Sequence, residues 1–236
     1  NLHSIYRRDQ LLTGCYWDVL AALPSVVPAG PIGLMGLGAG TVPRIIAGCY
    51  PGGRHLVHGW ELDAGVVMVG RMHLGMQELE DSGRLVVHTG DALAPDATVP
   101  GGFSGIIVDL FAGGRLLPQL TKRDTWEALR RSLDSTQPGA RIIANLGQSP
   151  PSAPGTPWAP EAYTTLRAYE ALEAAFEGDV SLMSVQSNTV ALTGPLPSQD
   201  EWPGRLPEGL QGLRDVGHWA RDSYPLQRQA GATPLF

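Results

Sequence analysis

The sequence contains few cysteines and almost no lysine, and it lacks an apolar run long enough for a membrane span. Its two cysteines, Cys15 and Cys49, show no metal-ligand spacing. We expect both thiols to be reduced, which favours an intracellular compartment. The longest uncharged stretch, about residues 19–43, is interrupted by prolines and glycines, which excludes a membrane-spanning helix there. We therefore expect a soluble protein of the cytoplasm, or of the chloroplast if a transit peptide has been removed.

Positive charge and nucleophile motifs are also scarce. The formal net charge is −6, with 17 basic residues against 23 acidic ones, which argues against a nucleic-acid partner. The six histidines show no ligand spacing, so we predict no metal site. The sequence contains neither a Gly-x-Ser-x-Gly elbow nor a nucleophilic arrangement of cysteine and histidine. These absences argue against nucleophilic and metal-dependent hydrolases.

The segment PIGLMGLGAGTVPRIIAG, residues 31–48, is the most informative part of the chain. An apolar run typical of a buried strand leads into three closely spaced glycines and then into a helix-like segment. Glu61 ends a second apolar run about 25 residues after the first of these glycines. Glycine lets the backbone approach a ligand closely, and a carboxylate at the end of the next strand can accept hydrogen bonds from ribose hydroxyls. The pattern predicts a nucleoside-cofactor cradle formed by Gly36, Gly38, Gly40 and Glu61.

Two further acids are predicted at the ends of strands. Asp91 lies in TGDAL, just after an apolar run at 85–88, and Asp109 lies near the end of the apolar run GIIVDLF at 105–111. The carboxyl ends of parallel strands meet at one edge of a sheet, and ligands bind in the crevice there. We therefore expect Glu61, Asp91 and Asp109 to line one crevice together with the glycines.

The order of predicted elements is β-α-β-α-β, then β-α-β, then a helix and two short strands. This order specifies a mostly parallel, Rossmann-like α/β sheet of seven strands with helices on both faces and a C-terminal antiparallel hairpin at its edge. Thr41 and Asp63 are the predicted N-caps of the two helices after the first two strands. We divide the chain into an N-terminal segment with a short helix (1–30), a cofactor-binding domain (31–194) and an irregular tail packed on the domain (195–236). The predicted helices are about 16–23, 41–49, 63–74, 118–135 and 160–176, and the predicted strands are about 32–35, 56–61, 85–88, 105–111, 140–146, 181–186 and 189–194.

Several segments resemble motifs of the class I AdoMet-dependent methyltransferase superfamily, in particular its spermidine-synthase-like (aminopropyltransferase-related) branch. GLGAGT resembles the glycine motif, WELD the acidic motif, TGDAL the adenine motif and SGIIVDLF the stretch around the fourth strand. CYWDVLAALP resembles the short segment that precedes the fold in aminopropyltransferases. The resemblance covers about residues 14–147. Plant-type proteins described as spermidine-synthase-like or methyltransferase-like are the nearest kind.

This resemblance implies a class I methyltransferase fold that binds S-adenosyl-L-methionine (AdoMet) or decarboxylated AdoMet. It implies that the glycine loop holds the donor together with Glu61, which would bind the ribose. Asp91, with its neighbour Ala92, would contact the adenine. Asp109 would orient or deprotonate the acceptor and is therefore the predicted catalytic residue.

The chain departs from the aminopropyltransferase pattern at positions that would face a polyamine. Ala39 stands where the glycine motif of those enzymes has an aspartate, and Ala112 replaces their second aspartate after the fourth strand. A polycationic acceptor needs several carboxylates to replace its lost hydration. We therefore favour methyl transfer to a small molecule over aminopropyl transfer. The further substrate-binding candidates are Tyr16 and Asp18 of the short N-terminal helix.

Three functions stay open: a methyltransferase, an aminopropyltransferase, and a non-catalytic protein that keeps the fold for binding or assembly. Each acid also has a structural alternative. Glu61 could cap a helix, Asp91 could be a turn residue, Asp18 could be a surface acid, and Asp109 could cap a helix or pair with Arg115. We expect a small-molecule substrate and no nucleic-acid or membrane partner, and we leave a homodimer open.

Overall fold

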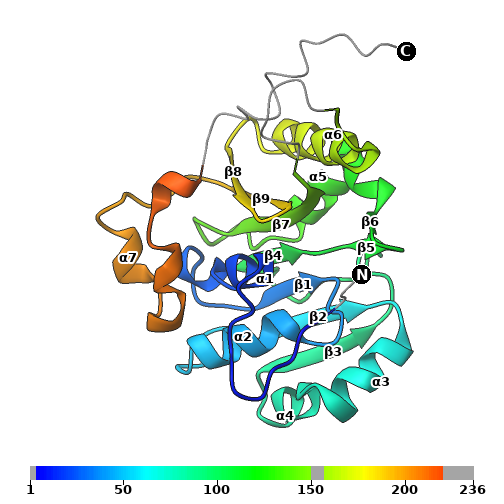
Figure 1. Cartoon of the computed structure of the whole chain (residues 1–236), viewed down its shortest axis with the longest axis vertical. Coiled ribbons are helices and arrows are strands. Elements are labelled where there is room, and N and C mark those ends of the chain that lie inside the picture. The colour runs from blue at the N-terminus through cyan, green and yellow to red at the C-terminus, as the bar shows by residue number, and fades with distance from the viewer. Residues whose placement is uncertain (1–3, 150–156, 220–236) are drawn as a thin grey trace.

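A seven-stranded, mostly parallel sheet forms the centre of the computed structural model, which describes residues 4–149 and 157–219 (Figure 1). Its strands are β1 (Ile32–Met35), β2 (Val57–Glu61), β3 (Leu85–Thr89), β4 (Gly105–Val108), β7 (Arg141–Gln148), β8 (Val180–Val185) and β9 (Asn188–Thr193). Their order across the sheet is β3-β2-β1-β4-β7-β9-β8. β9 runs antiparallel to both of its neighbours, and the other pairings are parallel. The predicted parallel sheet with a C-terminal antiparallel hairpin at its edge is therefore confirmed.

The central strands bury side chains on both faces of the sheet. Successive residues point to opposite faces, so Leu34 belongs to one core and Met35 to the other, as do Ile107 and Val108. All four are fully buried. Short, continuous apolar runs satisfy this arrangement because neither face of a central parallel strand contacts water.

Helices cover both faces of the sheet. α1, α2, α3 and α4 contribute to the core that contains Leu34, whereas α5 and α6 contribute Trp126 and Leu172 to the core that contains Met35. Figure 1 shows α2 across β1 and β2, and α5 and α6 beside the other half of the sheet. The helices are α1 (Tyr16–Leu20), α2 (Thr41–Cys49), α3 (Ala64–His73), α4 (Met76–Asp81), α5 (Arg123–Arg131), α6 (Pro160–Ala175) and α7 (Trp202–Arg205), with 3₁₀ helices η1 (Leu23–Ser25), η2 (Pro118–Thr121), η3 (Glu208–Leu213) and η4 (Val216–His218).

Two helices are shorter than the sequence predicts. The predicted helix 16–23 ends at Leu20, and Pro24 lies inside the 3₁₀ helix η1 instead of stopping an α-helix. The predicted helix 118–135 is divided into η2 and α5 by an extended residue, Lys122. Proline fits the first turn of a helix, so Pro118 begins η2. The spacing of Trp126, Leu129 and Leu133 predicts one buried face over this segment, and Trp126 and Leu129 are buried in α5, whereas Leu133 lies beyond its end.

One of the two predicted helix caps is wrong. Asp63 caps α3 as predicted, since its side chain accepts a hydrogen bond from Gly65 N–H at 2.7 Å. Thr41 is instead the first residue of α2, and Gly40 is the cap residue with a φ of 92°. The Thr41 hydroxyl accepts a hydrogen bond from Ile5 N–H at 2.9 Å. It therefore fastens the N-terminal segment to the helix.

The fourth strand is shorter than predicted, and a hairpin follows it. β4 ends at Val108, so Asp109 lies directly after the strand. β5 (Phe111–Ala112) then pairs antiparallel with β6 (Arg115–Leu116) in a separate two-stranded sheet. Gly113 and Gly114 join them with φ values of 57° and 76°. Such tight turns need positive φ at both positions, which glycine adopts without strain.

The described part of the C-terminal tail, residues 195–219, packs on the body of the protein. Trp202, Leu210 and Trp219 are buried in the same core as α1 and α2. The Trp202 indole N–H also donates a hydrogen bond to Leu213 O at 2.6 Å. Figure 1 shows α7 and the segments around it beside α1 and α2. Residues 220–236 of the predicted tail lie outside the described residues.

Within residues 4–149 and 157–219, the structure contains no helix that is both long and apolar enough to cross a bilayer.

Candidate functional site

The glycine loop after β1 depends on its glycines. Gly36, Gly38 and Gly40 have φ values of 94°, 56° and 92°, in the region that glycine adopts without a steric penalty. A Cβ on Gly36 would lie only 2.2 Å from Asp109 O. The loop therefore lies directly against the chain after β4.

Glu61 joins the glycine loop to the start of α3. Its Oε2 accepts a hydrogen bond from Gly38 N–H at 2.9 Å, and its Oε1 accepts one from Asp63 N–H at 3.0 Å. The side chain is partly exposed. A carboxylate offers about four acceptor positions, so both oxygens can still accept hydrogen bonds from ligand hydroxyls. Because Asp63 caps α3, Glu61 is not needed as its cap.

Asp91 and Ala92 lie in the turn after β3. Asp91 is exposed, and its Oδ1 accepts a hydrogen bond from Leu93 N–H at 2.9 Å. This hydrogen bond is typical of an aspartate in a turn, which is the structural alternative to a role in ligand binding. The second oxygen, Oδ2, belongs to the same exposed side chain. The side chain of Ala92 is buried in the core, with 5% exposure. Any contact between Ala92 and a ligand therefore involves its backbone.

Asp109 lies at the centre of a hydrogen-bonded cluster. Tyr16 donates its hydroxyl hydrogen to Asp109 Oδ2 at 3.3 Å, and Asn145 Nδ2 donates to Asp109 Oδ1 at 2.9 Å. Asn145 Oδ1 in turn accepts from Asn188 Nδ2 and from Gly147 N–H, both at 3.0 Å. Tyr16 comes from α1, Asn145 from β7 and Asn188 from β9. Three separate elements thus fix the position of one carboxylate.

Burial changes the acidity of this cluster. It raises the pKa of Asp109 to about 6, although hydrogen bonds from Asn145, Tyr16 and Trp17 oppose the rise. Burial, followed by the negative charge of Asp109, also raises the pKa of the Tyr16 hydroxyl. Asp109 is therefore mostly ionised at neutral pH, yet its pKa is close enough to neutrality for it to accept and release a proton. Arg115 forms its ion pair with Glu161 at 3.8 Å rather than with Asp109.

Asp18 lies in the first turn of α1, and its carboxylate accepts hydrogen bonds from the loop that precedes this helix. Its side chain is buried, with 8% exposure. Its Oδ1 accepts hydrogen bonds from the N–H and the hydroxyl of Thr13 at 2.9 and 2.8 Å, and its Oδ2 accepts from Gly14 N–H at 2.7 Å. These three hydrogen bonds fix both carboxylate oxygens to the loop. Of the two substrate-binding candidates, the structure brings Tyr16 to Asp109 and turns Asp18 toward the loop.

The N-terminal segment reaches the glycine loop. Ala39 N–H donates a hydrogen bond to Ser4 Oγ at 2.8 Å, and Arg44 donates to Ile5 O at 2.6 Å. The Arg44 guanidinium also lies 5.0 Å from the centre of the Tyr6 ring. The side chain of Ala39 is buried, with 6% exposure. The segment before α1 therefore forms part of the wall around the loop.

Three residues that bear on the site were not singled out from the sequence. Asn145 lies in a strand-like run and Asn188 lies in the predicted turn between two such runs, and a single amide there gives no signal of its own. Leu62 follows Glu61 directly and keeps 75% of its side chain exposed. A single exposed leucine is not unusual in a folded protein. The position of Leu62, directly after the predicted strand that ends at Glu61, is the signal that could have identified it.

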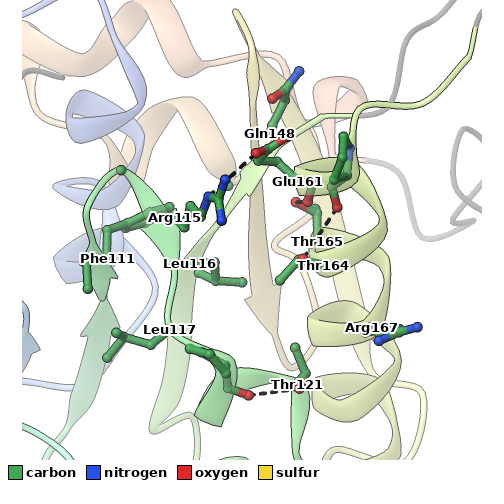
Figure 2. Close-up of a pocket in the computed structure, with 15 residues that line it drawn as sticks. Phe111, Arg115, Leu116, Leu117, Thr121, Gln148, Glu161, Thr164, Thr165 and Arg167 are labelled. Atoms are coloured by element: carbon green, nitrogen blue, oxygen red, sulfur yellow. Dashed lines mark hydrogen bonds and ion pairs between the residues drawn. The ribbon is translucent and has the colours of Figure 1, made fainter.

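A cavity of about 500 Å³ lies beside this crevice (Figure 2). The β5–β6 hairpin and η2 form one side, and the end of β7 and the first turns of α6 form the other. Among the described residues, no group of three or more His, Cys, Asp or Glu side chains could hold a metal ion.

The structure is similar to several solved AdoMet-related proteins. It matches a spermidine synthase in complex with the transition-state analogue AdoDATO with a TM-score of 0.62 and 16% identity, over 81% of this chain and 63% of that chain. It matches human methyltransferase-like protein 13 in complex with SAH with a TM-score of 0.58 and 17% identity, over 84% of this chain and 90% of that chain. A spermidine synthase from Thermotoga maritima gives a TM-score of 0.58 and 15% identity, over 76% of this chain and 59% of that chain.

These similarities show that the chain has the Rossmann-like class I methyltransferase fold, as the sequence predicts. The chain spans 63% and 59% of the length of the two spermidine synthases. No protein-family model matches the sequence, and no curated protein matches it significantly.

Proposed function

We propose that the protein is a group transferase that binds AdoMet or a close relative and transfers a methyl group to a small molecule. One observation carries the proposal: the glycine loop, Glu61, Asp91 and Asp109 follow four adjacent strands at the same edge of the sheet. Ligands of open α/β sheets bind at this edge. The similarity to AdoMet-related transferases supports the same fold and the same location.

The residues at this edge fit the parts of the donor. Glu61 has free acceptor capacity for two ribose hydroxyls, because its two hydrogen bonds to backbone N–H leave lone pairs on both oxygens. Asp91 is exposed and can accept a hydrogen bond from the amino group of an adenine. The exposed side chain of Leu62 offers an apolar surface to the flat base. When bound, the donor supplies an activated methyl group with a good leaving group.

The protein's own contribution is positioning and proton transfer. Asp109 is held from two sides by Tyr16 and Asn145, which orients its carboxylate before any acceptor binds. With a pKa of about 6, it is ionised at neutral pH and can take a proton from a hydroxyl or amine of the acceptor. In this proposal Asp109 is the catalytic residue and Asn145 is a positioning residue.

Aminopropyl transfer is the second candidate, and the spermidine synthase with a TM-score of 0.62 favours it. Against it, position 39 is an alanine whose side chain is buried, so this part of the glycine loop offers no carboxylate to a polyamine. Asp18, which could have added a carboxylate, is committed to the N-terminal loop. The crevice therefore has few carboxylates to replace the hydration of a polycation.

A non-catalytic role is the third candidate, and the hydrogen bonds that hold Asp109 in place favour it. Both carboxylate oxygens already accept hydrogen bonds from the protein, as they would in a purely structural cluster. Donor binding separates this candidate from the first two.

Isothermal calorimetry with AdoMet, decarboxylated AdoMet and methylthioadenosine tests the proposal. We expect AdoMet to bind at micromolar concentration and more tightly than its decarboxylated form. A preference for decarboxylated AdoMet would favour aminopropyl transfer. Absence of binding of all three at millimolar concentration would contradict both enzymatic functions.

The variant Glu61→Ala tests the position of the ribose. We expect the dissociation constant for AdoMet to rise about tenfold or more, because hydrogen bonds to a charged group contribute about 1.5–3 kcal/mol. Glu170→Ala, at an exposed position of α6, is the matched control and should leave affinity unchanged. Calorimetry measures both. An unchanged affinity in Glu61→Ala would show that the ribose lies elsewhere.

A further inference from the structure

The cavity beside the crevice continues from the residues that flank Asp109. Its wall includes Phe111, two residues after Asp109, and Gly147, two residues after Asn145. Asp109 and Asn145 are joined by a hydrogen bond of 2.9 Å. On the other side, the chain after β4 contacts the glycine loop, since a Cβ on Gly36 would meet Asp109 O. The segment from Asp109 to Phe111 thus separates the glycine loop from the cavity.

The β5–β6 hairpin fixes the backbone at one wall of the cavity. Ala112 pairs with Arg115, and Phe111 pairs with Leu116. This register determines to which face of the hairpin each of these side chains points. Arg115 extends from this hairpin toward Glu161 and Gln148 across the opening (Figure 2). The position of a cation at this opening is therefore a consequence of the hairpin.

The ion pair at the opening is weak. Arg115 Nε lies 3.8 Å from Glu161 Oε1, and the two side chains are 80% and 38% exposed. Exposed pairs of this kind contribute little to stability. A ligand carboxylate can therefore replace Glu161 as the partner of Arg115, and it can form the two parallel hydrogen bonds that a guanidinium offers. Arg167, the other cation of the lining, points away from the cavity in Figure 2.

The interior of the cavity combines apolar surface with hydroxyl acceptors. Phe111, Leu116 and Leu117 lie on the hairpin side, and Thr164 and Thr165 face them from α6 (Figure 2). Both threonine hydroxyls donate their hydrogens to backbone carbonyls, Thr164 to Pro160 O and Thr165 to Leu146 O. They are therefore left with acceptor positions. Such a cavity suits an apolar body with a polar end.

We propose that this cavity binds a small carboxylic acid with an apolar, ring-sized body, whose carboxylate pairs with Arg115. The inference rests on the proposed function in one respect, namely that this acid is the acceptor of the methyl group. Glu161 is the single acid of the lining, so the cavity offers too few carboxylates to replace the hydration of a polyamine. The opening at Arg115 determines the charge of the ligand, and the volume of about 500 Å³ accommodates a molecule of the size of a substituted benzoic acid.

Ligand-observed NMR titration with benzoate, benzamide and putrescine tests the proposal. We expect benzoate to bind at least fivefold more tightly than benzamide, and Arg115→Gln to reduce the affinity for benzoate to that for benzamide. Glu161→Gln should strengthen the binding of benzoate, because it removes a competing carboxylate. Arg123→Gln is the matched control, since this exposed arginine also pairs with a glutamate, Glu127 on α5, but does not line the cavity, and it should change nothing.

Equal binding of benzoate by the wild-type protein and Arg115→Gln would overturn the inference, and so would tighter binding of putrescine than of benzoate. Arg115 is 80% exposed, so the variant should fold, and urea unfolding checks this directly. A parallel titration with AdoMet separates the two proposals. AdoMet binding without benzoate binding contradicts the carboxylate site alone, whereas benzoate binding without AdoMet binding supports the site and contradicts the proposed function.

Discussion

Burial raises the pKa of Asp109 to about 6 from its usual 3.8, and this shift links the residue to stability. The folded protein binds more protons than the unfolded chain between about pH 4 and pH 6. The stabilisation that comes from binding a proton to Asp109 in the folded state is therefore fully present below pH 4, and it is lost as the pH rises through 6. This is the opposite of the usual behaviour of a carboxylate that pairs with a cation.

The variant Asp109→Asn tests this dependence. Between pH 4 and pH 8 its free energy of unfolding should increase relative to the wild type by about 1–3 kcal/mol, because a shift of two pKa units corresponds to about 3 kcal/mol. Urea unfolding at several pH values measures the difference. Asp200→Asn, at an exposed position, corrects for the loss of one surface charge. A difference that stays constant with pH would show that Asp109 is not destabilised by burial.

Leu62 exposes a large apolar side chain directly after Glu61. The variant Leu62→Ser should change the free energy of unfolding by less than about 0.5 kcal/mol, because the side chain is 75% exposed. It should nevertheless weaken AdoMet binding about fivefold, since the loss of apolar contact with a base corresponds to about 1 kcal/mol. Met72→Ser, 67% exposed on the last turn of α3, is the control for both measurements. Equal effects of the two variants on affinity would contradict the placement of the base.

Single residues of the site differ in how far the sequence reveals them. Glu61 and Asp91 are candidates from the sequence because Glu61 ends one apolar run and Asp91 follows another, and both runs are strands in the structure. Asn145 was not a candidate, although it donates a hydrogen bond to Asp109, because its role depends on a strand that is far away in the sequence. Asp18 stays a predicted substrate-binding residue, but the sequence could not show that its carboxylate accepts hydrogen bonds from the preceding loop, because a short helix does not determine which way its first turn faces.

At the scale of elements, the glycine loop and the chain after β4 form one unit. The variant Gly36→Ala should destabilise the fold by about 2–4 kcal/mol, since its Cβ would lie 2.2 Å from Asp109 O and its φ is positive. Gly52→Ala has nothing within 4 Å of its Cβ and should cost far less. Urea unfolding compares the two. A small effect in Gly36→Ala would show that the loop can move away from Asp109.

Elements with a strong periodic pattern were predicted well, and elements set by turns were not. The runs that became β1 and β4 are apolar on both faces, and α6 matches the predicted helix 160–176 closely. The β5–β6 hairpin was missed, although two adjacent glycines between short apolar segments are a recognised hairpin signal. The break between η2 and α5 depends on packing that the stripe of Trp126 and Leu129 does not encode.

At the scale of the whole molecule, the directions of the strands followed from the order of elements along the chain. The alternation of strands and helices predicts a parallel sheet, and the paired runs at its end predict the antiparallel edge. The sequence could not show which core the tail joins, because residues 195–219 have little periodicity. In the structure their large apolar residues pack with α1 and α2.

This packing connects the tail to the candidate catalytic residue. Trp202 belongs to the same core as Trp17 and Leu20 of α1, and Tyr16 of α1 donates a hydrogen bond to Asp109. Loss of the Trp202 side chain would open a cavity in this shared core, and we expect the helix that positions Tyr16 to loosen as a result. We therefore expect the tail to act on the crevice through α1.

The variant Trp202→Ala should lower the free energy of unfolding by about 3–5 kcal/mol, because Trp202 is 3% exposed and its removal leaves a large cavity. Hydrogen exchange should then increase in α1 and α2 more than in α5 and α6, which belong to the other core. Tyr163→Ala, at a position that is 50% exposed on α6, is the control and should leave both measurements nearly unchanged. Equal acceleration of exchange over all helices would show that the two cores unfold together. Acceleration confined to residues 195–219 would show instead that the tail detaches without loosening α1, and Tyr16 would then hold Asp109 independently of the tail.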